Sequence, residues 1–241
     1  MAKLETDASL EVIDLGHMAY APAMRVQRDM HRRVLEGTAA PTLLLVEHDP
    51  VITTTRHAAA SHLKASTESL ARMGIKVIQT DRGGNITYHG PGQLVAYPIL
   101  RLRPLRFNIG RYMHWLEQVV IDTVKTFGVQ AFRERRLTGV WVHPPPRRAA
   151  GEESLPAKLC SAGVRIERNV TLHGVALNVT TMLDHYKNIV PCGLTERSVT
   201  NLHELLGPHT PSMDRVKRVL AATTRRHLAL RSASILSSPF P

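Results

Sequence analysis

Cysteine is scarce in this chain, with two residues in 241, and aromatic side chains make up only 5% of it. Two thiols cannot build the dense disulfide framework of a small secreted fold, which favours a reducing cytoplasm. The Cys and His residues also lack the spacing of a metal-binding motif, so no metal site is expected. No apolar run approaches the ~20 residues that a membrane-spanning helix needs. The first ten residues lack the basic start and apolar centre of a signal peptide. We therefore expect a cytoplasmic protein that does not bind a membrane.

Acidic residues are also in the minority, because 20 Asp and Glu face 31 Lys and Arg, for a net charge of +11. A charge of this size favours acidic partners. Nucleic acid is the commonest such partner of a basic protein, but the few aromatic residues and the lack of a recognisable nucleic-acid-binding motif argue against it. A basic surface that keeps the protein soluble is an alternative explanation for most of these arginines.

Hydrophobic residues make up 43% of the chain, enough to bury a large core as a single domain over residues 1–241. We expect the core to run from about residue 12 to 230, with 1–11 and 231–241 loosely held. Apolar residues at helical spacing predict helices over 23–34, 112–127 and 213–220. Apolar runs predict strands over 42–47, 139–142, 164–166 and 172–179. Such a mixture indicates an α/β or α+β domain with a large sheet.

Capping residues mark the ends of these helices. Gly37 follows the first helical stripe, and Gly128 stands where the end of the second helix is expected. Asn108 and Ser212 are suitable N-caps for the second and last helices.

The segment 82–94, RGGNITYHGPGQL, contains four glycines between the apolar runs 75–78 and 94–99. Glycine accepts positive φ and lets a ligand lie close to the backbone. A plain hairpin needs only one or two such residues. The cluster taken alone fits either a loop shaped around a ligand or a wide structural turn.

Further segments decide between these interpretations. The glycine-rich segment resembles the substrate-binding signature of the octanoyltransferases, the lipoyl(octanoyl) transferases of lipoate biosynthesis. Matching segments follow in the same order, namely EHDPV at 47–51, KLCSAGVR at 158–165, TLHGVALN at 171–178 and IVPCGL at 189–194. The resemblance extends from about residue 17 to 207. It implies the α+β fold of the lipoate and biotin protein ligase catalytic domains, with a large mixed sheet packed by helices.

Two residues carry the chemistry that the resemblance implies. A lone cysteine is most often a small buried hydrophobe, but Cys192 matches the family's acyl-accepting nucleophile. A free thiol with a pKa of about 8.5 is only slightly ionised at neutral pH, so a nearby base or cation is required. Lys158 matches the partner of that cysteine. It either takes a proton as a neutral amine or stays protonated and stabilises the thiolate, and the sequence leaves both roles open.

The remaining candidate residues would form the pocket. His89 and His173 are either a polar wall of the site or hydrogen-bonded structural residues. Arg82 either binds a carbonyl or anionic group, or pairs with Asp81. Cys160 is a rival nucleophile, interpreted as a small packing residue. The resemblance assigns substrate contacts to Arg82, Gly83, Gly84, Asn85, Ile86, Thr87, Tyr88, His89, Ser161, Ala162, Gly163, Gly174, Val175 and Ala176, with His173 and Asn178 in support.

The resemblance thus implies transfer of an octanoyl group from octanoyl-acyl carrier protein to a lysine of apo lipoyl domains. These belong to 2-oxoacid dehydrogenase complexes and the glycine cleavage H protein. A monomer that needs neither ATP nor a metal is expected. The alternatives are an ATP-dependent lipoate-protein ligase and a non-catalytic binding module for acidic carriers or nucleic acid. Thr55 and Ala162 depart from the family pattern, where a glycine and a larger aliphatic residue are usual.

Overall fold

The computed structural model describes residues 10–144, 155–190 and 198–237. The strands are β1 (Glu11–His17), β2 (Thr42–Glu47), β3 (Val51–Thr54), β4 (Lys76–Gln79), β5 (Ile86–His89), β6 (Gln93–Ile99), β7 (Ala131–Phe132), β8 (Val140–Val142), β9 (Ala157–Glu167) and β10 (Val170–Asn178). The helices are α1 (Tyr20–Glu36), α2 (Thr67–Arg72), α3 (Ile109–Lys125), α4 (Leu202–Leu206) and α5 (Met213–Ser237), with 3-10 turns η1 (Ala60–His62), η2 (Leu183–Asn188) and η4 (Gly207–His209).

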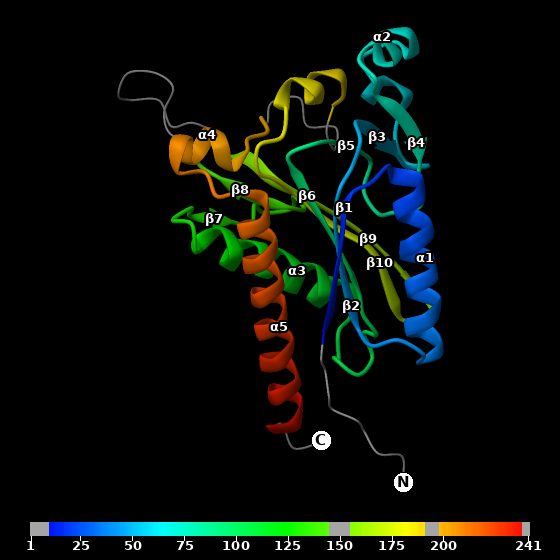
Figure 1. Cartoon of the computed structure of the whole chain (residues 1–241), viewed down its shortest axis with the longest axis vertical. Helices are drawn as coiled ribbons and strands as arrows, with labels where there is room; N and C mark the ends of the chain where they lie inside the picture. Colours follow the sequence, from blue (N-terminus) through cyan, green and yellow to red (C-terminus); the bar gives the residue numbers. More distant parts are fainter. Residues whose placement is uncertain (1–9, 145–154, 191–197, 238–241) are drawn as a thin grey trace.

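Seven strands form one mixed sheet in the order β1-β2-β6-β10-β9-β8-β7. The strands β1 and β2 are parallel, and each of the other neighbouring pairs is antiparallel. Helix α1 covers one face of the sheet, whereas α3 and α5 cover the other (Figure 1). The fold therefore has three layers, with a core on each face of the sheet. The predicted fold class, a large mixed sheet packed by helices, is confirmed.

Strand β2 shows how the sequence produces these layers. Side chains alternate across a strand, and Leu43 and Leu45 accordingly pack in the core beneath α3 and α5. Leu44 and Val46 pack in the core beneath α1. A strand buried on both faces is apolar along its length, which explains the unbroken apolar run LLLV at residues 43–46.

A small second sheet, in the order β4-β3-β5, positions the glycine-rich segment. The strand β3 pairs in parallel with β4 and antiparallel with β5. The connection 80–85 therefore leaves β4 and crosses beside the end of β3 before it enters β5. The small sheet lies next to the N-terminal end of α1 (Figure 1).

The predicted capping residues lie at or near helix ends. The side chain of Asn108 accepts a hydrogen bond from the backbone N–H of Arg111 at 2.8 Å, and Gly37 adopts a φ of 81° at the end of α1. Ser212 accepts from the backbone N–H of Arg215 at 3.4 Å. Helix α3 ends at Lys125, and Gly128 takes a φ of 84° in the turn that follows.

Two sequence predictions of length were wrong. The strand predicted over 164–166 is the end of the eleven-residue β9, because Ala157 to Ser161 pair with β8 and β10 as well. The last helix, predicted over 213–220, continues to Ser237. Its C-terminal half is anchored by Arg231, whose guanidinium donates to the carbonyl of Leu105 at 2.9 Å.

Candidate active site

A narrow slot opens between the glycine-rich segment and the strands β9 and β10. Its wall combines residues from α1, β5, β6, β9 and β10, from the connection 80–85 and from the connection between β7 and β8. The lining residues are Tyr20, Arg82, Gly84, Asn85, Ile86, Thr87, His89, Val95, Tyr97, Thr138, Lys158, Ser161, Ala162, Gly163, His173, Gly174, Val175 and Ala176. Segments that lie up to about 150 residues apart in the sequence thus form one pocket.

Arg82 holds the glycine-rich segment in place from within. Its guanidinium donates to the carbonyl of Thr53 at 2.8 Å and to the carbonyl of Asn85 at 3.3 Å. The hydroxyl of Thr55 donates to the carbonyl of Gly84 at 2.9 Å. Thr55, the departure from the family pattern, therefore forms a hydrogen bond to the loop that a glycine could not make.

Gly83 in this segment and Gly163 on β9 allow two backbones to touch. The N–H of Gly83 donates to the carbonyl of Val164 at 2.8 Å, which joins the loop to β9. A Cβ on Gly163 would lie 2.8 Å from the carbonyl oxygen of Gly83, closer than real side chains come. The two glycines are thus required for the contact between the loop and the strand.

Lys158 is almost fully buried, at 5% exposure, and lies in the slot wall on β9. Its Nζ lies 4.7 Å from the centre of the Trp141 ring, within the range of a cation–π contact. Its backbone N–H donates to the carbonyl of Ser198 at 2.9 Å, and its carbonyl accepts from Thr200 at 3.0 Å. The chain that follows residue 197 is therefore bound directly to the strand that carries Lys158.

The predicted nucleophile Cys192 lies in 191–197, outside the described residues. The described residues on either side of this gap both connect to the slot. Ser198 is bound to Lys158, and the N–H of Val190 donates to the carbonyl of His62 at 2.8 Å. The Nδ1 of His62 lies 2.9 Å from Oδ1 of Asn85, which lines the slot.

Cys160, the rival thiol, is fully buried in the core beneath α3 and α5. Burial raises the pKa of this thiol far above its ordinary value, so it stays protonated at neutral pH. Its sulfur lies 3.5 Å from the carbonyl oxygen of Ser161. A buried, protonated thiol is a poor nucleophile, and Cys160 occupies the place of a packing residue.

His89 lines the slot, and the ring of His48 lies edge to face against it, with ring centres 5.8 Å apart. His89 donates from Nδ1 to the amide oxygen of Gln93 at 2.7 Å, and burial lowers its pKa to about 3. His48 donates from Nδ1 to the carbonyl of Met18 at 2.9 Å and accepts from the hydroxyl of Tyr97 at 2.8 Å. Burial lowers the pKa of His48 to about 4. Both rings are therefore neutral at pH 7, and Nε2 of His89 has no proton.

His173 is buried in β10 with a φ of 59°, a conformation rare outside glycine. Its backbone N–H donates to the side chain of Gln27 on α1 at 2.8 Å, and its Nε2 lies 2.8 Å from Oδ1 of Asp81. Burial lowers the pKa of His173, so the neutral ring donates to the carboxylate. This hydrogen bond, together with Arg28, holds the pKa of Asp81 well below its usual range. Asp81 thus connects the connection 80–85 to His173 on β10 and to Arg28 on α1.

Most of the predicted contact residues line the slot, but Gly83 and Tyr88 do not, and neither does the supporting residue Asn178. Gly83 faces a neighbouring cleft instead. The hydroxyl of Tyr88 points away, 2.7 Å from Nδ1 of His185. Asn178 is buried behind the slot, where its side chain accepts from Gln93 and donates to the carbonyl of Thr200.

Sequence reasoning missed four residues of the wall, namely Tyr20, Val95, Tyr97 and Thr138. Val95 and Tyr97 are two apart on β6, so strand alternation could have placed them on one face. Nothing in the sequence connects Tyr20, in the first turn of α1, with the glycine-rich segment.

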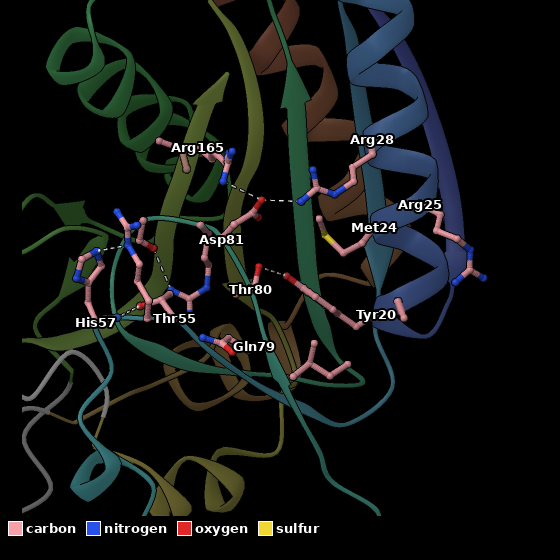
Figure 2. Close-up of a pocket in the computed structure, with 16 residues that line it drawn as sticks. Tyr20, Met24, Arg25, Arg28, Thr55, His57, Gln79, Thr80, Asp81 and Arg165 are labelled. Atoms are coloured by element: carbon pink, nitrogen blue, oxygen red, sulfur yellow. Dashed lines mark hydrogen bonds and ion pairs between the residues drawn. The ribbon is translucent and has the colours of Figure 1, made fainter. Parts of the chain in front are cut away.

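A larger, open cleft of about 1060 Å³ adjoins the slot, and Tyr20 and Arg82 line both. Five arginines and one carboxylate line this cleft, namely Arg25, Arg28, Arg56, Arg82, Arg165 and Asp81. The carboxylate of Asp81 lies between Arg28, at 2.6 Å, and Arg165, at 3.0 Å (Figure 2).

The sheet and its slot belong to a catalytic domain of the lipoyl protein ligase type. Residues 19–225 match the family described as the lipoyl protein ligase A/B catalytic domain, and the chain belongs to this family. The similarity to the octanoyltransferases, and with it the assignment to the acyltransferases, is confirmed.

Two relatives show how far this similarity extends. An octanoyltransferase of Koribacter versatilis is 44% identical over 200 residues, which cover 82% of this chain and 76% of the relative. An octanoyltransferase of Chloroflexus aggregans is 42% identical over 215 residues, which cover 89% and 93%.

Solved structures share the fold at much lower sequence identity. A bipartite lipoate protein ligase from Thermoplasma acidophilum has a TM-score of 0.66 at 18% identity, covering 91% of this chain and 83% of that one. A lipoate-protein ligase A bound with ATP has a TM-score of 0.65 at 17% identity, covering 91% and 85%. In the described parts of the chain, no helix is long and apolar enough to cross a membrane.

Proposed function

We propose that this enzyme transfers an octanoyl group from octanoyl-acyl carrier protein to the lysine of an apo lipoyl domain, through a thioester on Cys192. The observation that carries the proposal is the buried Lys158 in the slot wall, whose backbone binds Ser198. Cys192 precedes Ser198 by six residues, which span at most about 22 Å when fully extended. It follows Val190 by two residues, at most about 7 Å. Both connections are short enough for the thiol to reach the slot, as the proposal requires.

In the resting enzyme, Lys158 is an ammonium ion that stabilises the Cys192 thiolate. The ring face of Trp141 lies 4.7 Å from Nζ of Lys158, where it can contact a cation. The thiolate attacks the carbonyl carbon of the donor thioester, and the bond from that carbon to the sulfur of the carrier breaks. The departing thiolate takes a proton from Lys158. The octanoyl group remains on Cys192, and Lys158 is now a neutral amine.

In the second half of the reaction, the lysine of the lipoyl domain attacks the enzyme thioester. This amine is protonated in water at neutral pH, and it loses one proton to solvent as it enters. Its nitrogen bonds to the acyl carbon, its second proton passes to Lys158, and the Cys192 thiolate leaves. The amide is formed, and the resting ion pair is restored.

Small residues make room for the acyl chain. Ala162, Gly163, Gly174 and Ala176 lie in the slot wall, and their short side chains leave space for methylene groups. Burial of each methylene contributes about 0.8 kcal/mol, which favours a medium chain over a shorter one. Because conversion of a thioester to an amide is downhill, the reaction needs no nucleotide or metal. The acceptors would be the lipoyl domains of 2-oxoacid dehydrogenase complexes and the glycine cleavage H protein, in the cytoplasm.

Mass spectrometry of the intact enzyme after mixing with octanoyl-acyl carrier protein tests the nucleophile. We expect one octanoyl adduct on Cys192, loss of this adduct on addition of apo lipoyl domain, and no adduct in Cys192→Ser. Transfer at the wild-type rate by Cys192→Ser would refute the covalent route. A folded enzyme without any adduct would favour a non-catalytic binding module.

The same assay distinguishes the transferase from an ATP-dependent ligase. Transfer is measured with the octanoyl carrier and with free octanoate, each with and without ATP. We expect product from the carrier thioester in both conditions and none from octanoate. A strict requirement for ATP would assign the chain to the ligases.

A further inference from the structure

We propose that the arginine-lined cleft binds a phosphodiester, namely that of the 4′-phosphopantetheine arm on which the donor thioester arrives. This inference rests on the proposed function and deepens it, since it assigns a subsite to the donor arm. It concerns the cleft lined by Arg28, Arg56 and Arg165, which the reaction on Cys192 and Lys158 does not use.

The first argument is charge. Five arginines line the cleft, and Asp81 is its single carboxylate. Asp81 accepts from Arg28, Arg165 and His173, so its one negative charge is shared among several donors. An added anion therefore meets an excess of guanidinium groups, which bind phosphate oxygens through paired, charge-assisted hydrogen bonds.

Arg56 supplies a guanidinium on the opposite side of the cleft from α1. Its Nε lies 3.2 Å from Nε2 of the adjacent His57, and both side chains are exposed. Figure 2 shows His57 and Thr55 on one side of Asp81, and Arg28 and α1 on the other. A phosphate in the cleft can thus be approached from both sides. Arg25 also lines the cleft, but its side chain points away from Asp81 in this view.

The second argument is continuity with the slot. Tyr20 and Arg82 line both pockets, so a molecule with its acyl group in the slot can extend past them into the cleft. The donor thioester has this form, with an apolar tail at one end, amide groups between and a phosphodiester at the other end. Met24, Ile78 and Val164 add apolar surface along the cleft for the methyl groups of the arm.

A nucleotide carries the same phosphate chemistry, but the cleft suits it less well. A purine base binds best against an open aromatic face. The aromatic rings that line the cleft are Tyr20 and His57, and Tyr20 is already stacked on His89 with ring centres 6.0 Å apart. The pantetheine arm is therefore the occupant that we assign, and the nucleotide is an outcome of the test.

Two donors that differ in one phosphate group provide the test. Wild-type enzyme is assayed with octanoyl-pantetheine and with octanoyl-4′-phosphopantetheine, and kcat/KM is measured for each. We expect the phosphorylated donor to be used about tenfold better or more, because the phosphate gains charge-assisted hydrogen bonds. In the double variant Arg28→Gln, Arg56→Gln, this ratio should fall towards one.

Arg32→Gln is the matched control, because Arg32 lies on the same helix, is exposed, pairs with Asp29 and does not line the cleft. It should keep the wild-type ratio. If the double variant does not fold, Arg56→Gln alone tests the same point, since Arg56 lies outside the Asp81 cluster. Equal use of the two donors by wild-type enzyme, or an unchanged ratio in the variants, would overturn the subsite and leave the transferase intact. Failure of both donors would instead overturn the proposed function together with the subsite.

Inhibition separates the two sources of phosphate. Free 4′-phosphopantetheine and ATP are each added to the reaction of wild-type enzyme with octanoyl-4′-phosphopantetheine. We expect 4′-phosphopantetheine to compete more strongly than ATP. Stronger competition by ATP would overturn the assignment to the pantetheine arm and favour a nucleotide site.

Discussion

The ring of His173 donates a hydrogen bond across the edge of the slot to the carboxylate of Asp81, with 2.8 Å between Nε2 and Oδ1. This contact joins β10 to the start of the glycine-rich connection. Asp81→Ala would leave the buried N–H of His173 without its acceptor, at a cost of about 1–3 kcal/mol in the free energy of unfolding. Urea denaturation measures this loss.

Asp49→Ala provides the comparison for Asp81→Ala. Asp49 also pairs with a histidine, His17, at 3.5 Å, but both side chains are about half exposed. A surface pair contributes little, so this variant should stay within about 0.5 kcal/mol of wild type. Equal effects of the two substitutions would contradict a structural role for the contact between His173 and Asp81.

The two neutral histidines predict that the protein loses stability in mild acid. The unfolded chain binds protons on His48 and His89 below a pKa of 6.5, whereas the folded chain does so only near 4 and 3. Unfolding therefore takes up protons in this interval, and stability falls as the pH falls. Each ring contributes a slope of about 1.4 kcal/mol per pH unit. The measurement is the free energy of unfolding at pH 7, 6 and 5.

His48→Gln should lower the slope of the free energy of unfolding against pH by about 1.4 kcal/mol per pH unit, the contribution of one ring. Substitution of the exposed His203 by Gln should leave the slope unchanged. A free energy of unfolding that is constant between pH 7 and pH 5 would show that the rings are protonated in the folded protein.

Local patterns in the sequence predict much of the layered fold. The apolar run of β2 requires burial on both faces, and α1 and α3 end or begin at residues whose backbone or side chain satisfies a helix end. These signals depend on neighbours within a few residues. For this reason these signals can be recognised from the sequence alone.

The details of the site depend on contacts between distant segments, and the sequence could not supply them. The pairing of β8 with β9 shifts register between Val140 and Trp141, which sets the position of Trp141 against Lys158. The positive φ of His173 is stabilised by Gln27, 146 residues away. The sequence motifs identified most residues of the pocket. The spacing of those motifs along the chain predicts neither the hydrogen-bond and packing partners of these residues nor the contribution of Tyr20.

Gly174 permits the close contact between β10 and β6 in the middle of the main sheet. A Cβ at this position would lie 2.1 Å from the carbonyl oxygen of Ala96, so the strands would have to separate. We expect Gly174→Ala to cost about 3 kcal/mol or more, measured by thermal and urea unfolding. In Gly110→Ala, in the first turn of α3, the new Cβ would lie 3.6 Å from Oδ1 of Asn108, an ordinary van der Waals contact. This control should be neutral or gain up to about 1 kcal/mol. Wild-type stability in Gly174→Ala would contradict the packing of the two strands.

Lys158→Arg separates the two parts of the proposed role of Lys158. Arginine keeps a positive charge but does not release a proton at neutral pH. The variant can still stabilise the Cys192 thiolate. It can neither protonate the departing thiolate of the carrier nor accept a proton from the incoming amine. We expect transfer to the lipoyl domain to fall by about 10²–10⁴-fold, in a rapid-quench assay that follows acyl-enzyme and product separately. In Lys158→Gln, which also lacks the charge, formation of the acyl-enzyme should fall further. Wild-type transfer by Lys158→Arg would show that Lys158 acts only as a cation.

Cys160→Ala tests whether the buried thiol has a chemical role. Cys160 is fully buried among the residues of the core beneath α3 and α5, so loss of its sulfur leaves a small cavity. The expected cost is about 1–2 kcal/mol in the free energy of unfolding. Because burial keeps this thiol protonated, formation of the acyl-enzyme should proceed at the wild-type rate, with one octanoyl group by mass spectrometry. Loss of the adduct in a folded Cys160→Ala enzyme, with the adduct retained in Cys192→Ser, would exchange the roles of the two cysteines.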